Sequence, residues 1–399
     1  PSKYNPIVNR ERATVRQQYI IERMLELGYI TPAQAEEAKS EVLTLKHRNQ
    51  FLNVQADYVA EMARQLIYAQ YGELTYTRGI NVYTTLNDEL QNTAYQSLRQ
   101  GIIDYERRQI YRGPEKFIEL GNTQKEIEDT LDDAFNEFSN NDDILVAVVL
   151  DVNPQKIQAV LNSGEHIEIT AEGLKPVQSG LAKSAPAKQK ITRGAVIRVR
   201  KNIKGNWEAT QLPEVEGAFV AVDPKTGGIK ALVGGFDFDK NKFNHVTQAW
   251  RQPGSSFKPF IYSASLEKGL TPATLINDSE LFFSAAQTGG QAWEPKNYDG
   301  SFDGPMTMRT ALAKSKNMVS IRILQEIQPQ FAQDWITRFG FDASRHPPYL
   351  TMALGAGSVT PLQMASAYSV FANGGHFLKP YLITKITDQK GNVLIETKK

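Results

Sequence analysis

Apolar residues recur with a helical period between residues 7 and 46. The first of them are Val15, Ile20, Ile21, Met24 and Leu27. This spacing predicts a helix that ends at Gly28, followed by a second helix with Thr31 as its N-cap and Pro32 at its first position. Two more helices are predicted, one over about 54–71 and one from Asp88 to about residue 109.

The middle of the chain follows a different pattern. A β-rich segment at 79–87 predicts a strand, and residues 126–143 are strongly acidic. Five strand-like segments follow, at 144–152, 156–163, 166–170, 195–201 and 206–212. Short strands joined by Gly and Asn turns predict a small β-barrel or sandwich. We interpret the acidic stretch as a solvated, mobile face rather than a binding site.

The last part of the chain combines two hairpins with a long helical region. Residues 217–235 predict two strands around a turn that contains Lys225-Thr226-Gly227, and a second hairpin is predicted around Lys390-Gly391. Residues 252–375 are mostly helical, with long loops. The chain has no internal repeat.

Composition narrows the function classes. The 399 residues are 41% hydrophobic and 22% charged, which predicts a globular protein of two or three domains. The net charge of +1 argues against nucleic acid as the main partner. Without cysteine there is no disulfide, thiolate nucleophile or zinc–thiolate site, and five scattered histidines offer little for a metal site or a Ser-His-Asp triad. We therefore expect no cofactor and no metal. The sequence has no signal peptide and no apolar run long enough to span a bilayer.

Candidate chemistry lies in the segment QPGSSFKPFIYSASLEKG, residues 252–269. A helix starting at Ser255 would have Pro259 in its first turn and bury one apolar stripe. The stripe consists of Phe257, Phe260, Ile261 and Ala264. Ser255 and Lys258 would then meet on one face, where an amine with a burial-lowered pKa can take the serine proton. Backbone N–H groups at the helix start could stabilise an oxyanion.

Three further short motifs bear on the hypothesis that Ser255 is a nucleophile and Lys258 its base. A second S-x-x-K, Ser265 to Lys268, ends the same helix and is interpreted as surface. Ser315 and Asn317 form an S-x-N motif, in which the hydroxyl could relay a proton and the amide could bind a peptide carbonyl. The active-serine signature runs S-x-x-K, S-x-N, K-T-G, and the first two occur in that order. The chain's K-T-G, at Lys225, precedes Ser255, so we interpret it as a structural turn.

Long segments resemble a known family. QPGSSFKPFIYSASLEKGLTPATLINDSE, WEPKNYDGSFDGPMTMRTALAKSKNMVSIRIL and LGAGSVTPLQMASAYSVFANGG resemble the transpeptidase domain of class A penicillin-binding proteins, the bifunctional cell-wall synthases. Residues 2–6 and the helix after them resemble the end of that family's glycosyltransferase domain. Residues 107–212 resemble the OB-like domain of the 1a type.

The resemblance implies a multidomain α+β fold. Its parts would be glycosyltransferase-domain helices at 1–46, a linker with the first transpeptidase strand and helix at 47–106, an OB-like β-barrel insertion at 107–212, and a β-sheet flanked by helices at 213–399. The glycosyltransferase glutamates would precede Pro1 and the functional K-T-G strand would follow Lys399. We therefore expect the chain to be a middle section of a longer enzyme.

The resemblance also implies roles at matching positions. Ser255 would attack the D-Ala-D-Ala carbonyl of a peptidoglycan stem peptide, with its own backbone N–H as half of the oxyanion hole. Lys258 would be the base, Ser315 would shuttle protons and Asn317 would bind the donor peptide. β-Lactam antibiotics would acylate Ser255 in place of the donor. The parent protein would be membrane-anchored by a segment outside this chain, at the periplasmic face of the bacterial inner membrane.

Other interpretations stay open. A serine β-lactamase would share both motifs but needs a deacylating base, usually in an E-x-x-L-N segment, and none follows Asn317. A non-enzymatic β-lactam sensor or scaffold would be acylated without turnover. The OB-like domain could bind accessory cell-wall proteins or act as a spacer. Trp293 and Tyr298 could line a cleft, although ordinary packing is the simpler role for both.

Overall fold

The computed structural model describes residues 4–7, 9–41 and 54–397. Residues 42–46, the end of the first predicted helical region, lie outside this part. The chain divides into two compact units: residues 1–53 with 99–216, and residues 54–98 with 217–399. The domain boundaries expected from the sequence, after residues 46, 106 and 212, stay predictions.

Two N-terminal helices form as the sequence predicts. Helix α1 spans Arg10–Glu26, and Gly28 follows it with φ +72°, a backbone conformation that glycine adopts without a steric penalty. Helix α2 spans Pro32–Ser40. Thr31 and Gln34 form a capping box at its start, each side chain bonding to the other's backbone N–H. The predicted end at Gly28 and cap at Thr31 are both confirmed.

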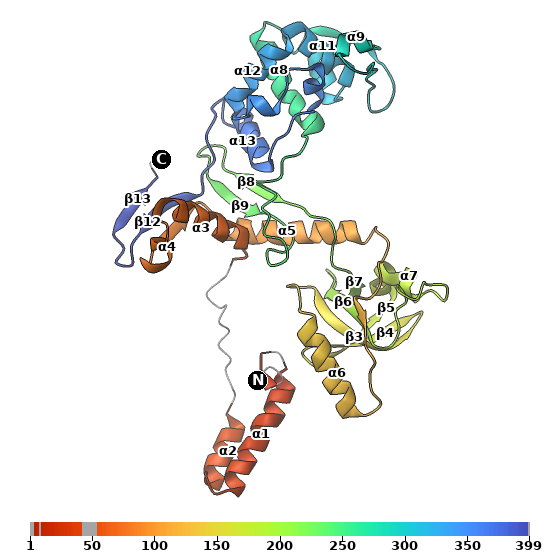
Figure 1. Ribbon diagram of the computed structural model, residues 1–399, viewed down its shortest axis with the longest axis vertical. Coiled ribbons are helices and arrows are strands. Elements are labelled where there is room, and N and C mark those ends of the chain that lie inside the picture. Colours follow the sequence, from red (N-terminus) through yellow and green to blue (C-terminus); the bar gives the residue numbers. More distant parts are fainter. Residues whose placement is uncertain (1–3, 8, 42–53, 398–399) are drawn as a thin grey trace. The chain divides into compact units, whose positions relative to one another are not determined.

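The larger part of this first unit is an antiparallel sheet (Figure 1). Its strands are β2 (Lys116–Phe117), β3 (Leu145–Asn153), β4 (Lys156–Leu161), β5 (His166–Thr170), β6 (Ala195–Lys201) and β7 (Trp207–Thr210). They pair in the order β2-β6-β3-β4-β5, and β7 also pairs with β6. All five predicted strands are present. Because β5 and β7 do not pair with each other, the described strands do not close into a hydrogen-bonded barrel. Between β5 and β6 lie a 3-10 helix, Ala171–Val177, and α7, Gln178–Leu181.

The acidic stretch forms helix α6, Gln124–Glu137, an element that its charge did not predict. Thr123 and Glu126 form a capping box at its start. Apolar residues at helical spacing, among them Leu131 and Ala134, pack on one face of the sheet against Val146 and other residues. The acidic residues occupy the other positions, so the stretch is an amphipathic helix.

The described residues of the second unit contain three small antiparallel sheets, one of which pairs β10 (Leu275–Asp278) with β11 (Gly304–Thr307). Helices α3 (Asp57–Tyr71) and α4 (Leu74–Thr77), strand β1 (Asn81–Thr84) and the first part of α5 (Asp88–Glu106) open it. Strand β1 pairs with β12 (Ile383–Thr387), which pairs with β13 (Val393–Glu396) around the predicted turn at Lys390-Gly391. Strands β8 (Phe219–Val222) and β9 (Ile229–Val233) form the predicted hairpin.

The rest of the second unit is a cluster of helices (Figure 1). Its elements are a 3-10 turn (Gly254–Phe257), α8 (Lys258–Glu267), β10 (Leu275–Asp278), α9 (Ala285–Thr288), β11 (Gly304–Thr307), α10 (Met308–Ala313), α11 (Asn317–Ile327), α12 (Pro329–Ile336), 3-10 turns at Thr337–Phe339, Ala343–Arg345 and Leu350–Leu354, and α13 (Pro361–Ala372). Helix α8 lies in the core of this cluster, against α11 and α12. The whole apolar stripe predicted for it is fully buried, and the predicted α+β class is confirmed.

Candidate functional site

The first candidate residue, Ser255, lies in a 3-10 turn that leads into α8. The α-helix itself starts at Lys258, three residues later than the sequence pattern suggested, and Pro259 is its second residue. Gly254 has φ +59°, so a glycine is suited to this corner. Ser255 is exposed, whereas Phe257 and Lys258 point into the protein. Within the described part of the chain, neither the hydroxyl nor the backbone N–H of Ser255 has a hydrogen-bond partner.

A second segment holds this turn in place. Arg251 and Val359 exchange both backbone hydrogen bonds, and the N–H of Gly254 donates to the carbonyl of Gly355 at 3.2 Å. The two backbone segments approach so closely that a Cβ on Gly355 would lie 2.0 Å from the Gly254 carbonyl oxygen. The segment LGAGSVTP therefore packs directly against the turn that carries Ser255.

Lys258 joins this turn to the S-x-N motif. Its side chain is 1% exposed, and its Nζ donates three hydrogen bonds. The acceptors are the backbone oxygen of Ser315 at 2.7 Å, the Oγ of Ser315 at 3.0 Å and the Oδ1 of Asn317 at 2.7 Å. An ammonium group has three N–H donors, so the protonated lysine is fully satisfied here. The structure thus brings together Lys258, Ser315 and Asn317.

Burial lowers the pKa of Lys258 to about 8. The low-dielectric interior disfavours the charged amine, and no carboxylate among the described residues is paired with it to restore that charge. At neutral pH a useful fraction of the side chain is therefore neutral. Lys258 follows the exposed Ser255 by three residues, and among the described residues no hydrogen bond joins the two side chains. The neutral amine is the form that a general base requires.

Ser315 occupies a strained junction between two helices. It follows α10, precedes α11 and has φ +55°, the left-handed region that non-glycine residues rarely adopt. This conformation costs roughly 1 kcal/mol, and it turns the Ser315 carbonyl and hydroxyl toward the same amine. Strain of this kind concentrates at functional sites.

The remaining short motifs are structural. Lys225-Thr226-Gly227 forms the β8–β9 turn, in which Asp223 accepts from the N–H of Lys225 and of Gly227, so the predicted hairpin turn is confirmed. The surface prediction for the second S-x-x-K is wrong at its serine. Ser265 is fully buried because it is on the core side of α8, and its hydroxyl donates to the Tyr262 carbonyl at 2.7 Å.

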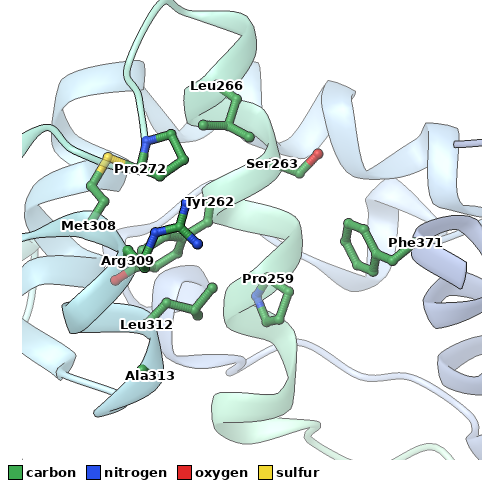
Figure 2. Close-up of a pocket in the computed structure, with 10 residues that line it drawn as sticks. All are labelled: Pro259, Tyr262, Ser263, Leu266, Pro272, Met308, Arg309, Leu312, Ala313 and Phe371. Atoms are coloured by element: carbon green, nitrogen blue, oxygen red, sulfur yellow. The ribbon is translucent and has the colours of Figure 1, made fainter. Parts of the chain in front are cut away.

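A groove of about 490 Å³ lies on a different face of α8 (Figure 2). Pro259, Tyr262, Ser263 and Leu266 of α8 form one wall, with Pro272, Met308, Arg309, Leu312, Ala313 and Phe371 around them. The candidate residues are not among its lining residues. The groove is mainly apolar, and nothing in the structure indicates what occupies it.

Sequence reasoning missed the polar residues behind Asn317, chiefly Asn297 and Asp278. Both are buried, and no short motif marks them. Trp293 and Tyr298, the two aromatic residues considered above, differ in their surroundings. Trp293 packs against Phe283 with ring centroids 5.3 Å apart, as expected, but Tyr298 is wholly exposed, so the packing role predicted for it is wrong.

The described residues provide no clear metal centre or membrane span. No three His, Cys, Asp or Glu side chains among them come together as a metal site. Among the same residues, no helix combines the length and apolar character needed to cross a bilayer.

Two family models match the chain. The penicillin-binding protein transpeptidase domain matches residues 217–399, and the penicillin-binding protein OB-like domain matches residues 111–215. Penicillin-binding protein 1A of Neisseria lactamica is 45% identical over 394 residues, which is 98% of this chain and 49% of that protein. Penicillin-binding protein 1A of Pseudomonas aeruginosa is 40% identical over 403 residues, 99% of this chain and 48% of that protein.

A solved structure shares the fold over the whole chain. The crystal structure of penicillin-binding protein 1A from Haemophilus influenzae superposes with a TM-score of 0.79 at 33% identity, covering 100% of this chain and 57% of that one. The chain spans about half the length of the curated relatives it matches.

Proposed function

The chain belongs to the penicillin-binding protein family, and we propose that it carries the acyl-transfer centre of a peptidoglycan-cross-linking D,D-transpeptidase. One observation carries this proposal most directly. Lys258, with its lowered pKa, is held by Ser315 and Asn317 three residues after an exposed serine. Ser255 is the nucleophile and Lys258 its base.

The protonation state of Lys258 decides when the centre is active. A neutral amine has two N–H donors and one lone pair. The Ser315 carbonyl and Asn317 Oδ1 can only accept, so they take the two donors. The lone pair is then directed to a hydroxyl, either that of Ser315 or that of Ser255. The Ser315 hydroxyl can donate as well as accept, which suits a proton shuttle.

Acylation then balances as follows. The Ser255 proton moves to Lys258 as Oγ bonds to the carbonyl carbon of the terminal D-Ala-D-Ala bond. The backbone N–H of Ser255 donates to the developing oxyanion. The C–N bond breaks, and the leaving amine of D-alanine takes a proton from Lys258 by way of Ser315. An amine of a second stem peptide resolves the ester by the reverse sequence, which forms the cross-link and frees Ser255.

Asn317 is suited to bind the donor peptide. Its Nδ2 carries two N–H groups, and one of them donates to the Lys296 carbonyl at 2.8 Å. The second is available for a peptide carbonyl of the substrate. The same groups would serve a β-lactam, whose amide mimics the donor bond and acylates Ser255.

The whole protein is, on this proposal, a class A synthase of the 1A type. Its glycosyltransferase domain polymerises glycan, and a membrane anchor places both activities at the periplasmic face of the inner membrane. The OB-like domain at 111–215 offers a surface for accessory cell-wall proteins. The partners with direct chemistry are stem peptides and β-lactams.

Fluorescent penicillin tests the nucleophile in the full-length protein. We expect a covalent adduct on Ser255, lost in Ser255→Ala. Ser256→Ala is the matched control, because the Ser256 hydroxyl is already used in a hydrogen bond to the Pro253 carbonyl. An adduct mapped to another serine would overturn the assignment.

Turnover separates transpeptidation from the alternatives. With a stem pentapeptide and an amine acceptor, we expect release of D-alanine and a cross-linked product. Rapid hydrolysis of penicillin would instead support a β-lactamase. A stable adduct with no D-alanine release from any donor would support a sensor or scaffold.

A further inference from the structure

Asn297 is a buried residue whose amide is fully used. It lies in the loop between α9 and β11 and is 5% exposed. Its Oδ1 accepts from the backbone N–H of Asn317 at 2.8 Å and of Met318 at 3.4 Å. Its Nδ2 donates to Asp278 Oδ1 and to the Ser301 carbonyl, both at 2.8 Å. These partners determine the orientation of the amide, since a flipped side chain would face donors with donors.

The hydrogen bond from the Asn317 N–H to Asn297 Oδ1 takes the place of a side-chain cap at the start of α11. The first backbone N–H groups of a helix need external acceptors, and Lys316, the N-cap of α11, supplies no side-chain bond. Asn297 provides that acceptor from a loop 20 residues away in sequence. The cap therefore fixes where α11 begins, which is also where Asn317 stands.

The same loop holds the Asn317 side chain. The Lys296 carbonyl accepts from Nδ2 of Asn317, so its Oδ1 is left facing Lys258 at 2.7 Å. Asn297 thus binds the backbone N–H of Asn317, and Lys296 binds its side chain. Among the described residues, the Lys296 carbonyl and the Lys258 amine are the two groups that orient this side chain, so loss of the first would allow it to rotate away from the second.

A buried ionic pair anchors Asn297 in turn. Asp278 is fully buried, and its Oδ2 accepts from the backbone N–H of Asp303 at 2.9 Å. The Nζ of Lys316 lies 3.3 Å from that carboxylate and 3.0 Å from the carboxylate of Asp303. Both carboxylate oxygens of Asp278 therefore accept a hydrogen bond, Oδ1 from Asn297 and Oδ2 from Asp303, which fixes Asp278 as an acceptor for Asn297.

We propose that Asn297 is a positioning residue for acyl transfer: anchored on Asp278, it holds Asn317 and, through it, the amine of Lys258. This inference rests on the proposed function for its catalytic consequence, but its structural part does not. Asn297 touches neither Ser255 nor Lys258, so it acts only through Asn317.

The catalytic test is a double-mutant cycle in the full-length protein. Asn297→Ala should lower the rate of Ser255 acylation by penicillin about ten- to a hundred-fold, since a small displacement of a positioned group costs that much. In an Asn317→Ala background the same change should alter the rate less than twofold, because the Asn317 side chain through which Asn297 acts on Lys258 is gone, although the backbone contact remains. Effects that multiply independently would overturn the proposal, as would a wild-type rate in Asn297→Ala.

Thr307→Ala is the matched control. The Thr307 hydroxyl caps α10 by accepting from the N–H of Thr310 at 3.2 Å, so its loss removes a cap from the neighbouring helix and leaves Asn317 untouched. We expect a comparable fall in melting temperature but a rate within twofold of wild type. If Thr307→Ala lowered the acylation rate as much as Asn297→Ala does, the effect of Asn297 would be one of general stability and not of positioning.

A structural readout separates this inference from the proposed function. With ¹⁵N-asparagine labelling, the backbone amide of Asn317, which donates to Asn297 Oδ1, should lose its protection from hydrogen exchange in Asn297→Ala and keep it in Thr307→Ala. Unchanged protection in Asn297→Ala would overturn the positioning role whatever the acylation rates. If wild-type protein is not acylated at Ser255, the proposed function fails, and this amide signal alone decides the role of Asn297.

Discussion

At the residue scale, Lys258 meets two opposed demands. Burial disfavours its charge, while three acceptors stabilise it when protonated. The balance leaves a pKa of about 8, far below the ordinary value for lysine. The residue can therefore change protonation state close to neutral pH.

This pKa predicts the pH dependence of acylation. Only the neutral amine can accept the Ser255 proton, so the rate should rise about tenfold per pH unit below pH 8 and level off above it. Stopped-flow acylation by penicillin between pH 5.5 and 9.5 measures the profile. Lys258→Ala should be slower by roughly a hundred-fold or more and lack the step. A flat wild-type profile would show that another group takes the proton.

His346 predicts a different pH effect, on stability. It is 1% exposed, its ring stacks on Phe257 at 4.8 Å, and neither ring nitrogen has a hydrogen-bond partner among the described residues. Burial lowers its pKa to about 4, whereas the unfolded chain has the ordinary value of about 6.5. Between these values the unfolded state binds more protons, so stability is complete above pH 6.5 and falls as the pH drops toward 4.

The loss from His346 between pH 7 and 4.5 should be about 2 kcal/mol. Urea unfolding at several pH values measures it. His346→Phe retains an aromatic ring next to Phe257 without the titrating group, so its free energy of unfolding should fall by that much less over the same interval. An equal acid-dependent fall in both proteins would assign the effect to other groups.

Among the helices and strands, the α10–α11 junction combines a strained backbone with two hydrogen bonds to Lys258. Ser315 holds its left-handed conformation because its carbonyl and hydroxyl both bond to Lys258. Glycine adopts this conformation without the penalty, and alanine does not.

Two substitutions at Ser315 should therefore separate stability from activity. Both Ser315→Gly and Ser315→Ala remove the hydroxyl, so both should acylate more slowly by a similar factor. Ser315→Gly should be more stable than Ser315→Ala by about 1 kcal/mol, because it relieves the strained backbone. Chemical denaturation and penicillin labelling measure the two effects. Equal stabilities would mean that the junction is not strained.

At the scale of the whole molecule, each unit has its own hydrophobic core. Ile157 and Ile169 belong to the core of the OB-like sheet, while Phe257 and Leu324 belong to that of the helical cluster. Separate cores of this size favour separate unfolding transitions, which a single two-state free energy cannot describe.

Calorimetry should distinguish the two cores by substitution. Ile157→Ala removes a fully buried side chain and should destabilise the OB-like unit by about 2–5 kcal/mol, lowering one transition. Penicillin should shift the other transition, because a ligand stabilises the unit that binds it. A single transition that moves with both changes would contradict this division.

Most of the local structure could be predicted from the amino-acid sequence. Helical periodicity, the cap at Thr31 and the turn at Lys390-Gly391 each depend on neighbours within a few residues, so they could be predicted without a fold. The buried stripe of α8 was predicted on the same basis, whereas the meeting of the Lys258 and Ser255 side chains stays a prediction. Helix α6 was missed because its acidic residues were weighted above the apolar spacing between them.

Contacts between segments far apart in the sequence became visible only in the folded protein. Lys258 reaches Ser315 across 57 residues, β1 pairs with a strand about 300 residues later, and Asn297 caps a helix to which it does not belong. Residue types at short spacing carry no information on which surfaces pack together. Such contacts form because the burial of an entire core brings distant segments into register, and that depends on all of its side chains at once.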